Sequence, residues 1–92
     1  MSAVPLVSVV VPVYNQEQFL GRCLRSLLVQ DFPRDDYEVV VVDDGSSDGT
    51  CHILDLFSGE IRVLRNEMNA GLPAALNRGI RSSSSLFTVR VD

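Results

Sequence analysis

The segment VVVVDDGSSDGT, residues 39–50, decides the fold. Its first four residues are all valine, a β-branched residue that favours strands. A strand that is apolar at every position is covered on both faces, as in a parallel sheet packed between helices. The polar residues that follow, from Asp43 to Thr50, are aspartates, glycines, serines and a threonine, most of which favour turns. The segment therefore predicts an inner strand of an α/β sheet that ends in a polar loop.

Three other short apolar runs have the composition of strands: residues 7–13, 61–64 and 86–91. The first is almost continuously apolar, which again predicts a strand covered on both faces. The run at 61–64 is broken by Arg62, so we expect it to be more exposed, and the run at 86–91 mixes the two patterns.

Three helices are predicted between these strands. The first covers Leu20–Leu28, because its leucines and Cys23 recur at spacings of three and four residues. Asn15 is predicted to cap this helix, with Gln18 three residues further on, as in a capping box.

The second helix is predicted to begin near Asp48–Thr50 and to end at Ser58-Gly59. The third is predicted to begin at Pro73, because proline is favoured in the first turn of a helix. Its apolar stripe consists of Leu72, Leu76 and Ile80. Gly79 within this helix costs about 1 kcal/mol relative to alanine. The serines at 82–85 are predicted to form a polar turn with no special role.

The resulting order, β-α-β-α-β-α-β, predicts three layers (α/β/α) around a mostly parallel, Rossmann-like sheet with right-handed crossovers. Residues 1–92 have the length of one small domain. Ligands of such sheets bind at the carboxyl ends of the strands, near the point where the strand order reverses. The candidate functional residues are therefore those that follow each strand.

Composition excludes several classes of function. All eight basic residues are arginine, against 12 acidic residues, and the net charge of −4 disfavours nucleic-acid binding. No apolar run approaches the roughly 18–20 residues that a transmembrane helix needs. The chain has no lysine, no P-loop and no dinucleotide-binding glycine motif. Its two cysteines form neither a disulfide framework nor a metal motif, so we expect a reduced, cytoplasmic protein.

Polar side chains follow all four predicted strands. Asp43 and Asp44 follow the all-valine strand, and Asp44-Gly45 permits a tight turn. Carboxylates accept hydrogen bonds from base N–H groups and ribose hydroxyls, although Asp43 capping the turn and Asp44 facing water is the simpler interpretation. An acidic nucleotide site without lysine usually needs a divalent cation to neutralise the diphosphate. Asp92, after the last strand, is placed to supply one ligand, and further ligands would come from beyond this chain.

Four blocks, taken in order, resemble the start of a family 2 glycosyltransferase with the GT-A fold. They are SVVVPVYN at 8–15, VVDDGSSDGT at 41–50, N-x-G with A-x-N-x-G-I within 69–80, and VRVD at 89–92. The resemblance covers nearly the whole chain. It implies transfer of a sugar from a nucleotide diphosphate sugar to a saccharide, lipid or protein acceptor, with uridine as the family's commonest donor base.

The resemblance also implies roles for individual residues. The base and ribose would be lined by Pro12, Val13 and Tyr14. Glu17, on the first turn of the following helix, would help to hold this site. Asp44 would accept a hydrogen bond from the base, with Asp43 supporting that turn.

Further roles fall on the second half of the chain. The loop Asn69–Gly71 and the helix residues Asn77 and Arg78 would flank the nucleotide and the donor sugar. Asp92 would be the first carboxylate of the family's Asp-x-Asp motif, facing ribose or a bound Mg²⁺ or Mn²⁺. The second carboxylate, the acceptor-binding half and a general base are absent from these 92 residues. We therefore expect an N-terminal portion of a larger enzyme that has no transferase activity alone.

Two alternatives stay open at this point. One is a non-catalytic nucleotide-binding or scaffolding domain of the same lineage. The other is a receiver-like or flavodoxin-like domain that uses Asp43 and Asp44 for Mg²⁺ binding or phosphoryl transfer, although receivers typically carry a late lysine. We also expect an uncovered sheet edge to favour self-association, and the parent enzyme to act at the cytoplasmic face of the membrane.

Overall fold

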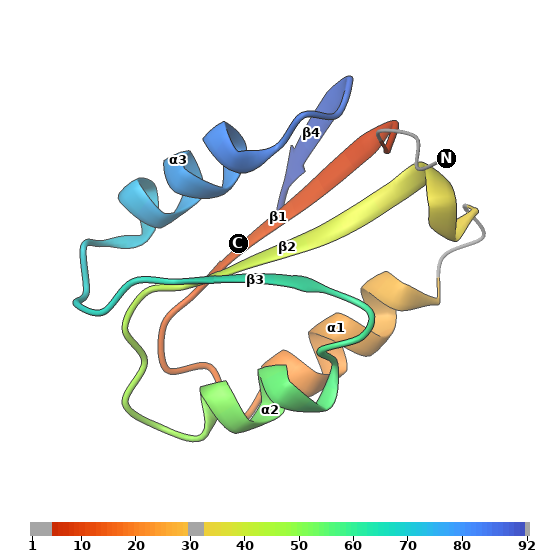
Figure 1. Cartoon of the computed structure of the whole chain (residues 1–92). Helices are drawn as coiled ribbons and strands as arrows, with labels where there is room; N and C mark the ends of the chain where they lie inside the picture. Colours follow the sequence, from red (N-terminus) through yellow and green to blue (C-terminus); the bar gives the residue numbers. More distant parts are fainter. Residues whose placement is uncertain (1–4, 30–32, 92) are drawn as a thin grey trace.

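The computed structural model describes residues 5–29 and 33–91 (Figure 1). Strands and helices alternate in the predicted order. The strands are β1 (Val7–Val13), β2 (Tyr37–Asp43), β3 (Arg62–Arg65) and β4 (Phe87–Arg90). The helices are α1 (Leu20–Leu28), α2 (Thr50–Leu56) and α3 (Leu72–Ser82), and a short 3-10 helix, η1 (Arg34–Asp36), precedes β2. Every predicted strand and helix is therefore confirmed, with some boundaries shifted by a few residues.

The strands form one parallel sheet in the order β3-β2-β1-β4. Near its centre, Val10 of β1 lies opposite Val40 of β2 on one side and Arg90 of β4 on the other. The chain moves outward from β1 to β2 and β3, and then returns to place β4 on the far side of β1. The strand order therefore reverses between β1 and β4, which is where ligands of open α/β sheets bind.

Helices cover both faces of the sheet. The helices α1 and α2 lie together on one face, and α3 lies on the other (Figure 1). The larger core cluster packs the sheet against the α1–α2 layer and includes the buried Leu24 and Leu54. A smaller cluster of Val10, Val42 and Ala75 lies beneath α3. Both faces of the inner strands are therefore buried, and the predicted α/β/α layering is confirmed.

The face that α3 turns towards the sheet differs in part from the prediction, because, of the predicted stripe, only Leu76 packs against the smaller cluster. The buried residues of the helix are Ala75 and Gly79, whereas Leu72 and Ile80 are 44% and 41% exposed. A Cβ atom at position 79 would overlap Val10 Cγ1. The helix backbone therefore lies too close to β1 for a larger side chain, and the small residues decide which face is inward.

The predicted N-cap of α1 is wrong. The helix begins at Leu20, and no side chain caps its first turn. Asn15 instead adopts a left-handed backbone conformation (φ 51°), which asparagine tolerates better than most residues. Its side-chain oxygen accepts a 2.8 Å hydrogen bond from the backbone N–H of Ser47, in the loop after β2. Asn15 therefore joins two loops.

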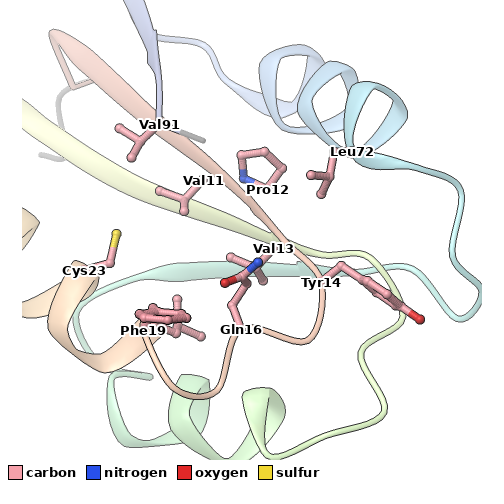
Figure 2. Close-up of a pocket in the computed structure, with 10 residues that line it drawn as sticks. Val11, Pro12, Val13, Tyr14, Gln16, Phe19, Cys23, Leu72 and Val91 are labelled. Atoms are coloured by element: carbon pink, nitrogen blue, oxygen red, sulfur yellow. The ribbon is translucent and has the colours of Figure 1, made fainter.

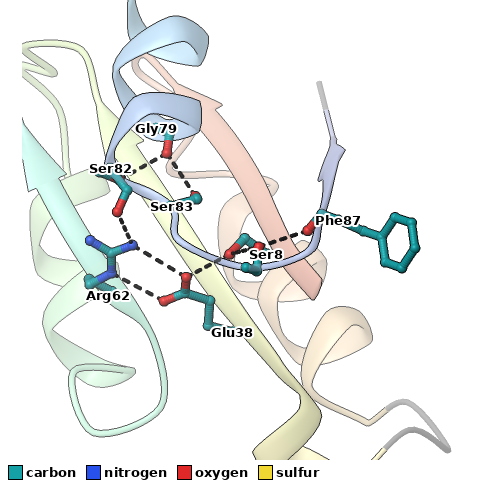
Figure 3. Close-up of polar contacts among 8 residues, drawn as sticks. Ser8, Glu38, Arg62, Gly79, Ser82, Ser83 and Phe87 are labelled. Atoms are coloured by element: carbon teal, nitrogen blue, oxygen red, sulfur yellow. Dashed lines mark hydrogen bonds and ion pairs between the residues drawn. The ribbon is translucent and has the colours of Figure 1, made fainter. Parts of the chain in front are cut away.

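A polar network links the first three strands to the end of α3 (Figure 3). The buried Ser8 hydroxyl donates to Glu38 Oε2 at 2.6 Å, and Arg62 Nε donates to Glu38 Oε1 at 3.2 Å. Arg62 also donates to the carbonyl of Ser82, and Ser85 Oγ donates to Ser8 Oγ at 2.7 Å. The prediction that the serine run has no special role is therefore wrong, because it ties the end of α3 to the sheet.

Candidate functional site

A pocket of about 240 Å³ lies at the carboxyl end of β1, beside the reversal of strand order (Figure 2). Its walls come from β1, the following loop, α1, the start of α3 and the residue after β4. The lining residues are Val11, Pro12, Val13, Tyr14, Gln16, Phe19, Leu20, Cys23, Leu72 and Val91. These side chains are mostly apolar, and pockets for drug-sized ligands are larger, at roughly 300–1,000 Å³. The pocket is therefore small and mostly apolar.

Three of the predicted site residues lie in this lining. Pro12 and Val13 end β1 and are buried, so the sheet fixes their positions. Tyr14 follows the strand and is 38% exposed as a residue. It is therefore accessible to a ligand from solvent.

Other lining residues carried no clear signal in the sequence. Leu72 is predicted to face the core as part of the α3 stripe, but it lines the pocket beside Pro12 (Figure 2). The side chains of Gln16 and Phe19 come from the segment that leads into α1. A smaller pocket of about 140 Å³ shares Pro12 and Leu72 with the first and includes Arg90 of β4. Only the folded chain brings these residues together.

The loop after β1 is bonded to the loop after β2. The Asn15 N–H donates to Ser46 Oγ at 2.9 Å, and the Gln16 N–H donates to Thr50 Oγ1 at 3.0 Å. Asp48 Oδ1 accepts a 2.9 Å hydrogen bond from the Thr50 N–H. Hydrogen bonding from Thr50 outweighs the effect of desolvation and holds the pKa of Asp48 below its usual value. These contacts fix the loop that carries Tyr14 and Gln16 at the pocket.

Among the predicted residues outside the pocket lining are three that are exposed. Glu17 is exposed, and its carboxylate lies against Gly49 in the loop after β2. Asn69 is also exposed, and its side-chain oxygen accepts a 3.1 Å hydrogen bond from the N–H of Gly71. Asn77 is exposed on α3. Their predicted contacts with a nucleotide sugar stay predictions.

Asp43 ends β2 and is almost fully buried. Its Oδ1 accepts a hydrogen bond from the Ser46 N–H at 3.1 Å, and its Oδ2 accepts one from Cys51 Sγ at 3.1 Å. The hydrogen bond to Asp43, together with burial and the carboxylate charge, raises the pKa of the Cys51 thiol. Asp43 therefore holds the turn after β2 and the start of α2 together.

Asp44 has no exposed surface, and its carboxylate is bonded to the loop after β3. Oδ1 accepts hydrogen bonds from Asn66 Nδ2 at 2.8 Å and the Ala70 N–H at 3.0 Å, and Oδ2 accepts one from the Gly71 N–H at 2.8 Å. Burial acts to raise the pKa of Asp44, but these hydrogen bonds outweigh it, so the pKa lies below its usual value. The interpretation that Asp44 faces water is wrong, and its contact with a base stays a prediction.

Arg78 was predicted to flank the nucleotide, and in the structure it reaches from α3 to the same loop. Its Nη1 donates to Asn66 Oδ1 at 2.6 Å and to the carbonyl of Arg65 at 2.7 Å. Asn66 therefore lies between Arg78 and Asp44. The position of Asn66 directly after β3 was the only sequence signal for it.

The predicted metal ligand, Asp92, lies outside the described residues. Within residues 5–29 and 33–91, no three histidine, cysteine, aspartate or glutamate side chains are grouped as metal ligands would be. Asp43 and Asp44 are already engaged in hydrogen bonds. The described side chains therefore do not provide the donor set of a divalent cation. None of the described helices combines the length and the apolar character needed to cross a bilayer.

The sequence matches a known family and several curated relatives. Residues 8–92 match Glycosyl transferase family 2. Glycosyltransferase AglE of Haloferax volcanii is 39% identical over 94 residues, which cover 99% of this chain and 31% of the relative. Poly(ribitol-phosphate) beta-N-acetylglucosaminyltransferase TarS of Staphylococcus aureus is 39% identical over 88 residues, which cover 92% of this chain and 15% of the relative. The chain spans less than a third of the length of these relatives.

Solved structures share the arrangement described above. S. aureus TarS 1-349 in complex with UDP-GlcNAc superposes with a TM-score of 0.87 at 38% identity, covering 94% of this chain and 26% of that chain. Mannosyltransferase PcManGT from Pyrobaculum calidifontis, in complex with GDP-Man and Mn²⁺, gives a TM-score of 0.80 at 32% identity, covering 90% and 26%. The predicted GT-A fold is confirmed by this similarity. The family match over most of its length shows that this chain belongs to glycosyl transferase family 2.

Proposed function

We propose that the pocket at the end of β1 binds the nucleoside part of a nucleotide diphosphate sugar, within a longer glycosyltransferase. The observation that carries the proposal is the position of the pocket at the reversal of strand order, in a chain of this family. Two solved relatives support it, because one is complexed with UDP-GlcNAc and the other with GDP-Man. The family match does not favour the scaffolding or receiver-like alternatives.

The lining suits a base better than a diphosphate. Pro12 and Val13 offer apolar surface, and the ring of Tyr14 can stack on the face of a base. The side-chain amide of Gln16 carries both donors and an acceptor, so it can bond to a base edge. We therefore place the base and ribose in this pocket and the diphosphate outside it, with UDP as the expected nucleotide.

We also propose that a divalent cation binds with the donor, and we assign one of its ligands. The solved mannosyltransferase holds Mn²⁺ together with its donor. We propose that Asp92 supplies one ligand and that residues other than the described ones complete the set, because the described side chains do not. Such a cation would neutralise the diphosphate of the donor.

Sugar transfer is proposed for the longer protein, with a saccharide, lipid or protein as acceptor. The base and ribose occupy the pocket in this proposal, so the acceptor hydroxyl would be deprotonated by a group outside it. We expect that group, and the acceptor-binding part, in the longer protein. We therefore expect the 92-residue chain to bind a donor nucleotide without turning over a nucleotide sugar.

Calorimetric titration of the 92-residue chain with UDP and with GDP, with and without Mn²⁺, tests the proposal. UDP should bind, and Tyr14→Ala should weaken it about five- to hundredfold, since stacking of a base on an aromatic ring contributes ~1–3 kcal/mol. The matched control is Phe87→Ala, which removes an exposed aromatic ring at the opposite end of the sheet and should leave the affinity unchanged. Absence of UDP binding, or equal losses in both variants, would contradict the proposal.

Two further proposals concern the whole chain. The four side chains of β4 are all exposed and the strand lies at a sheet edge, which supports self-association through this edge. Cys23 and Cys51 are both free, which supports a cytoplasmic location. Fractionation of cells that express the longer protein, with protease protection of its membrane-bound fraction, tests the location and the membrane face.

A further inference from the structure

We infer that Asn66 and Arg78 are positioning residues, which hold the loop of residues 66–71 against the buried Asp44 and thereby set the position of Leu72 in the pocket wall. The effect on the loop follows from geometry alone. The effect on ligand affinity rests on the proposed function as well.

The side chains of Arg78, Asn66 and Asp44 are linked by hydrogen bonds, and each donates to the next in that order. Arg78 Nη1 donates to Asn66 Oδ1 at 2.6 Å, and Asn66 Nδ2 donates to Asp44 Oδ1 at 2.8 Å. A guanidinium only donates and an ionised carboxylate only accepts, whereas an amide does both. Asparagine therefore fits between the cation and the anion, and bonds to charged groups are the stronger ones.

The turn after β2 supports the rest of the loop. The Asp44 carboxylate also accepts the backbone N–H groups of Ala70 and Gly71, at 3.0 and 2.8 Å. Gly45 has φ +80°, and a Cβ atom on it would lie 2.9 Å from the backbone nitrogen of Asn69. The loop therefore rests directly on this turn, and its backbone donors point at one carboxylate.

The loop leads directly into the pocket wall. The Gly71 carbonyl accepts the first hydrogen bond of α3, from the Ala75 N–H at 3.1 Å. Leu72, the next residue, lines both pockets together with Pro12. Because the Gly71 N–H is bonded to Asp44, movement of the loop away from this carboxylate would move Leu72 relative to Pro12.

Hydrogen exchange on the 92-residue chain tests the effect on the loop. Asn66→Ala removes both side-chain links, and the amides of Ala70 and Gly71 should then exchange about tenfold faster, while those of β1 and β2 keep their protection. Arg78→Ala removes the hydrogen bonds to Asn66 and to the Arg65 carbonyl but leaves the bond from Asn66 to Asp44, so it should have a smaller effect in the same direction. Unchanged protection of both amides in Asn66→Ala would overturn the inference.

Two control variants distinguish the loss of the Asn66 and Arg78 hydrogen bonds from other effects of substituting a charged surface residue. Glu67→Ala alters an exposed side chain of the same loop, and Arg81→Ala removes the same charge from an exposed position of α3. Neither should change the exchange of the loop amides. If Arg81→Ala and Arg78→Ala accelerated the exchange of the loop amides equally, the cause would be the loss of a positive charge. That result would overturn the role of Arg78.

An exchange of donor and acceptor distinguishes hydrogen bonding from space filling. Asn66→Asp keeps the acceptor for Arg78 but places one carboxylate against another, so protection of the loop should be lost. Combining it with Asp44→Asn restores a donor facing an acceptor, and part of the protection should return. In this double variant the hydrogen bond from the Ala70 N–H would still be absent, because the NH₂ group of the new asparagine at position 44 would face that N–H. Absence of any recovery in a folded double variant would overturn the inference.

Nucleotide titration tests the link to the pocket. Asn66→Ala should weaken the binding of UDP and of GDP severalfold and by similar factors. Leu72 in the pocket wall would move, but no contact with the base would be removed. Faster loop exchange with unchanged UDP affinity would overturn this link. If the wild-type chain binds no nucleotide, the proposed function fails, whereas the exchange experiment still decides whether Asn66 and Arg78 hold the loop.

Discussion

Gly79 is the residue at which α3 comes closest to the sheet. Alanine favours a helix by about 1 kcal/mol over glycine, but its Cβ atom would overlap Val10 Cγ1 and lie 3.0 Å from Val42 Cγ2. Overpacking of this kind costs about 1–3 kcal/mol, so Gly79→Ala should lower the free energy of unfolding in urea titrations. Gly21→Ala in α1 is the matched control, because its Cβ atom would have no neighbour closer than 3.8 Å, and it should stabilise the chain. Stabilisation by both substitutions would contradict the close approach.

Asp44 gives the loop after β3 a dependence on pH. Its pKa in the folded chain is below the ordinary 3.8, so its contribution is fully present above that value and is lost as the pH falls through the folded-state pKa. At pH 7, Asp44→Asn should lower the free energy of unfolding by about 1.5–3 kcal/mol, because an amide NH₂ replaces an acceptor of the loop. The difference from wild type should shrink in urea titrations at pH values below 3.8. A difference that stays constant down to pH 2 would contradict the assignment.

At the scale of residues, the sequence identifies some site residues but not their hydrogen-bond partners. Asp43 and Asp44 were identifiable because two carboxylates directly after an all-valine strand must find partners. Their partners were not, since the donors to Asp44 lie 22 to 27 residues further along the chain. Asn66 is polar and follows a strand like several other residues, and only its contacts distinguish it.

At the scale of elements, the pair between Glu38 of β2 and Arg62 of β3 links the sheet to the end of α3. The Arg62 and Glu38 side chains are 40% and 23% exposed, so solvent screens the pair, but Arg62 also donates to the carbonyl of Ser82. Arg62→Ala should therefore lower the free energy of unfolding by about 1 kcal/mol.

Arg65→Ala is the matched control for this prediction. Arg65 lies on the same strand, and its pair with Asp55 has side chains that are 47% and 72% exposed. Its loss should cost about 0–0.5 kcal/mol, as for other exposed pairs. Urea titration of both variants measures the difference, and equal costs would show that the network around Ser8 adds nothing to the ion pair.

Strands were predictable as elements because local composition decides them, with continuous valines where both faces are covered. Helix ends and faces were not. The predicted cap of α1, Asn15, instead bonds to Ser47, which lies 32 residues away. The inward face of α3 depends on a close approach to β1, which favours Ala75 and Gly79 over the larger Leu72 and Ile80.

At the scale of the whole molecule, the order of strands and helices is enough to predict where the pocket lies. The alternation of strands and helices predicts ligand binding where the strand order reverses, and the pocket lies there. Hydrogen bonds tie the loops together at that end of the sheet, and the network around Ser8 lies on the side of α3. The strand β4 forms the edge beyond β1, and all four of its residues are exposed.

This edge leads to the prediction that the 92-residue chain self-associates. Phe87 and Val89 of β4 are 58% and 49% exposed, and an open edge with apolar side chains pairs readily with another strand. Light scattering after size exclusion should give a mass that rises above the 10.1 kDa of the single chain as concentration increases. Val89→Lys should restore the single-chain mass, because a lysine on an edge strand blocks pairing, whereas Leu56→Lys, at an exposed apolar position of α2, should not. A single-chain mass at every concentration, or equal effects of the two lysines, would contradict association through β4.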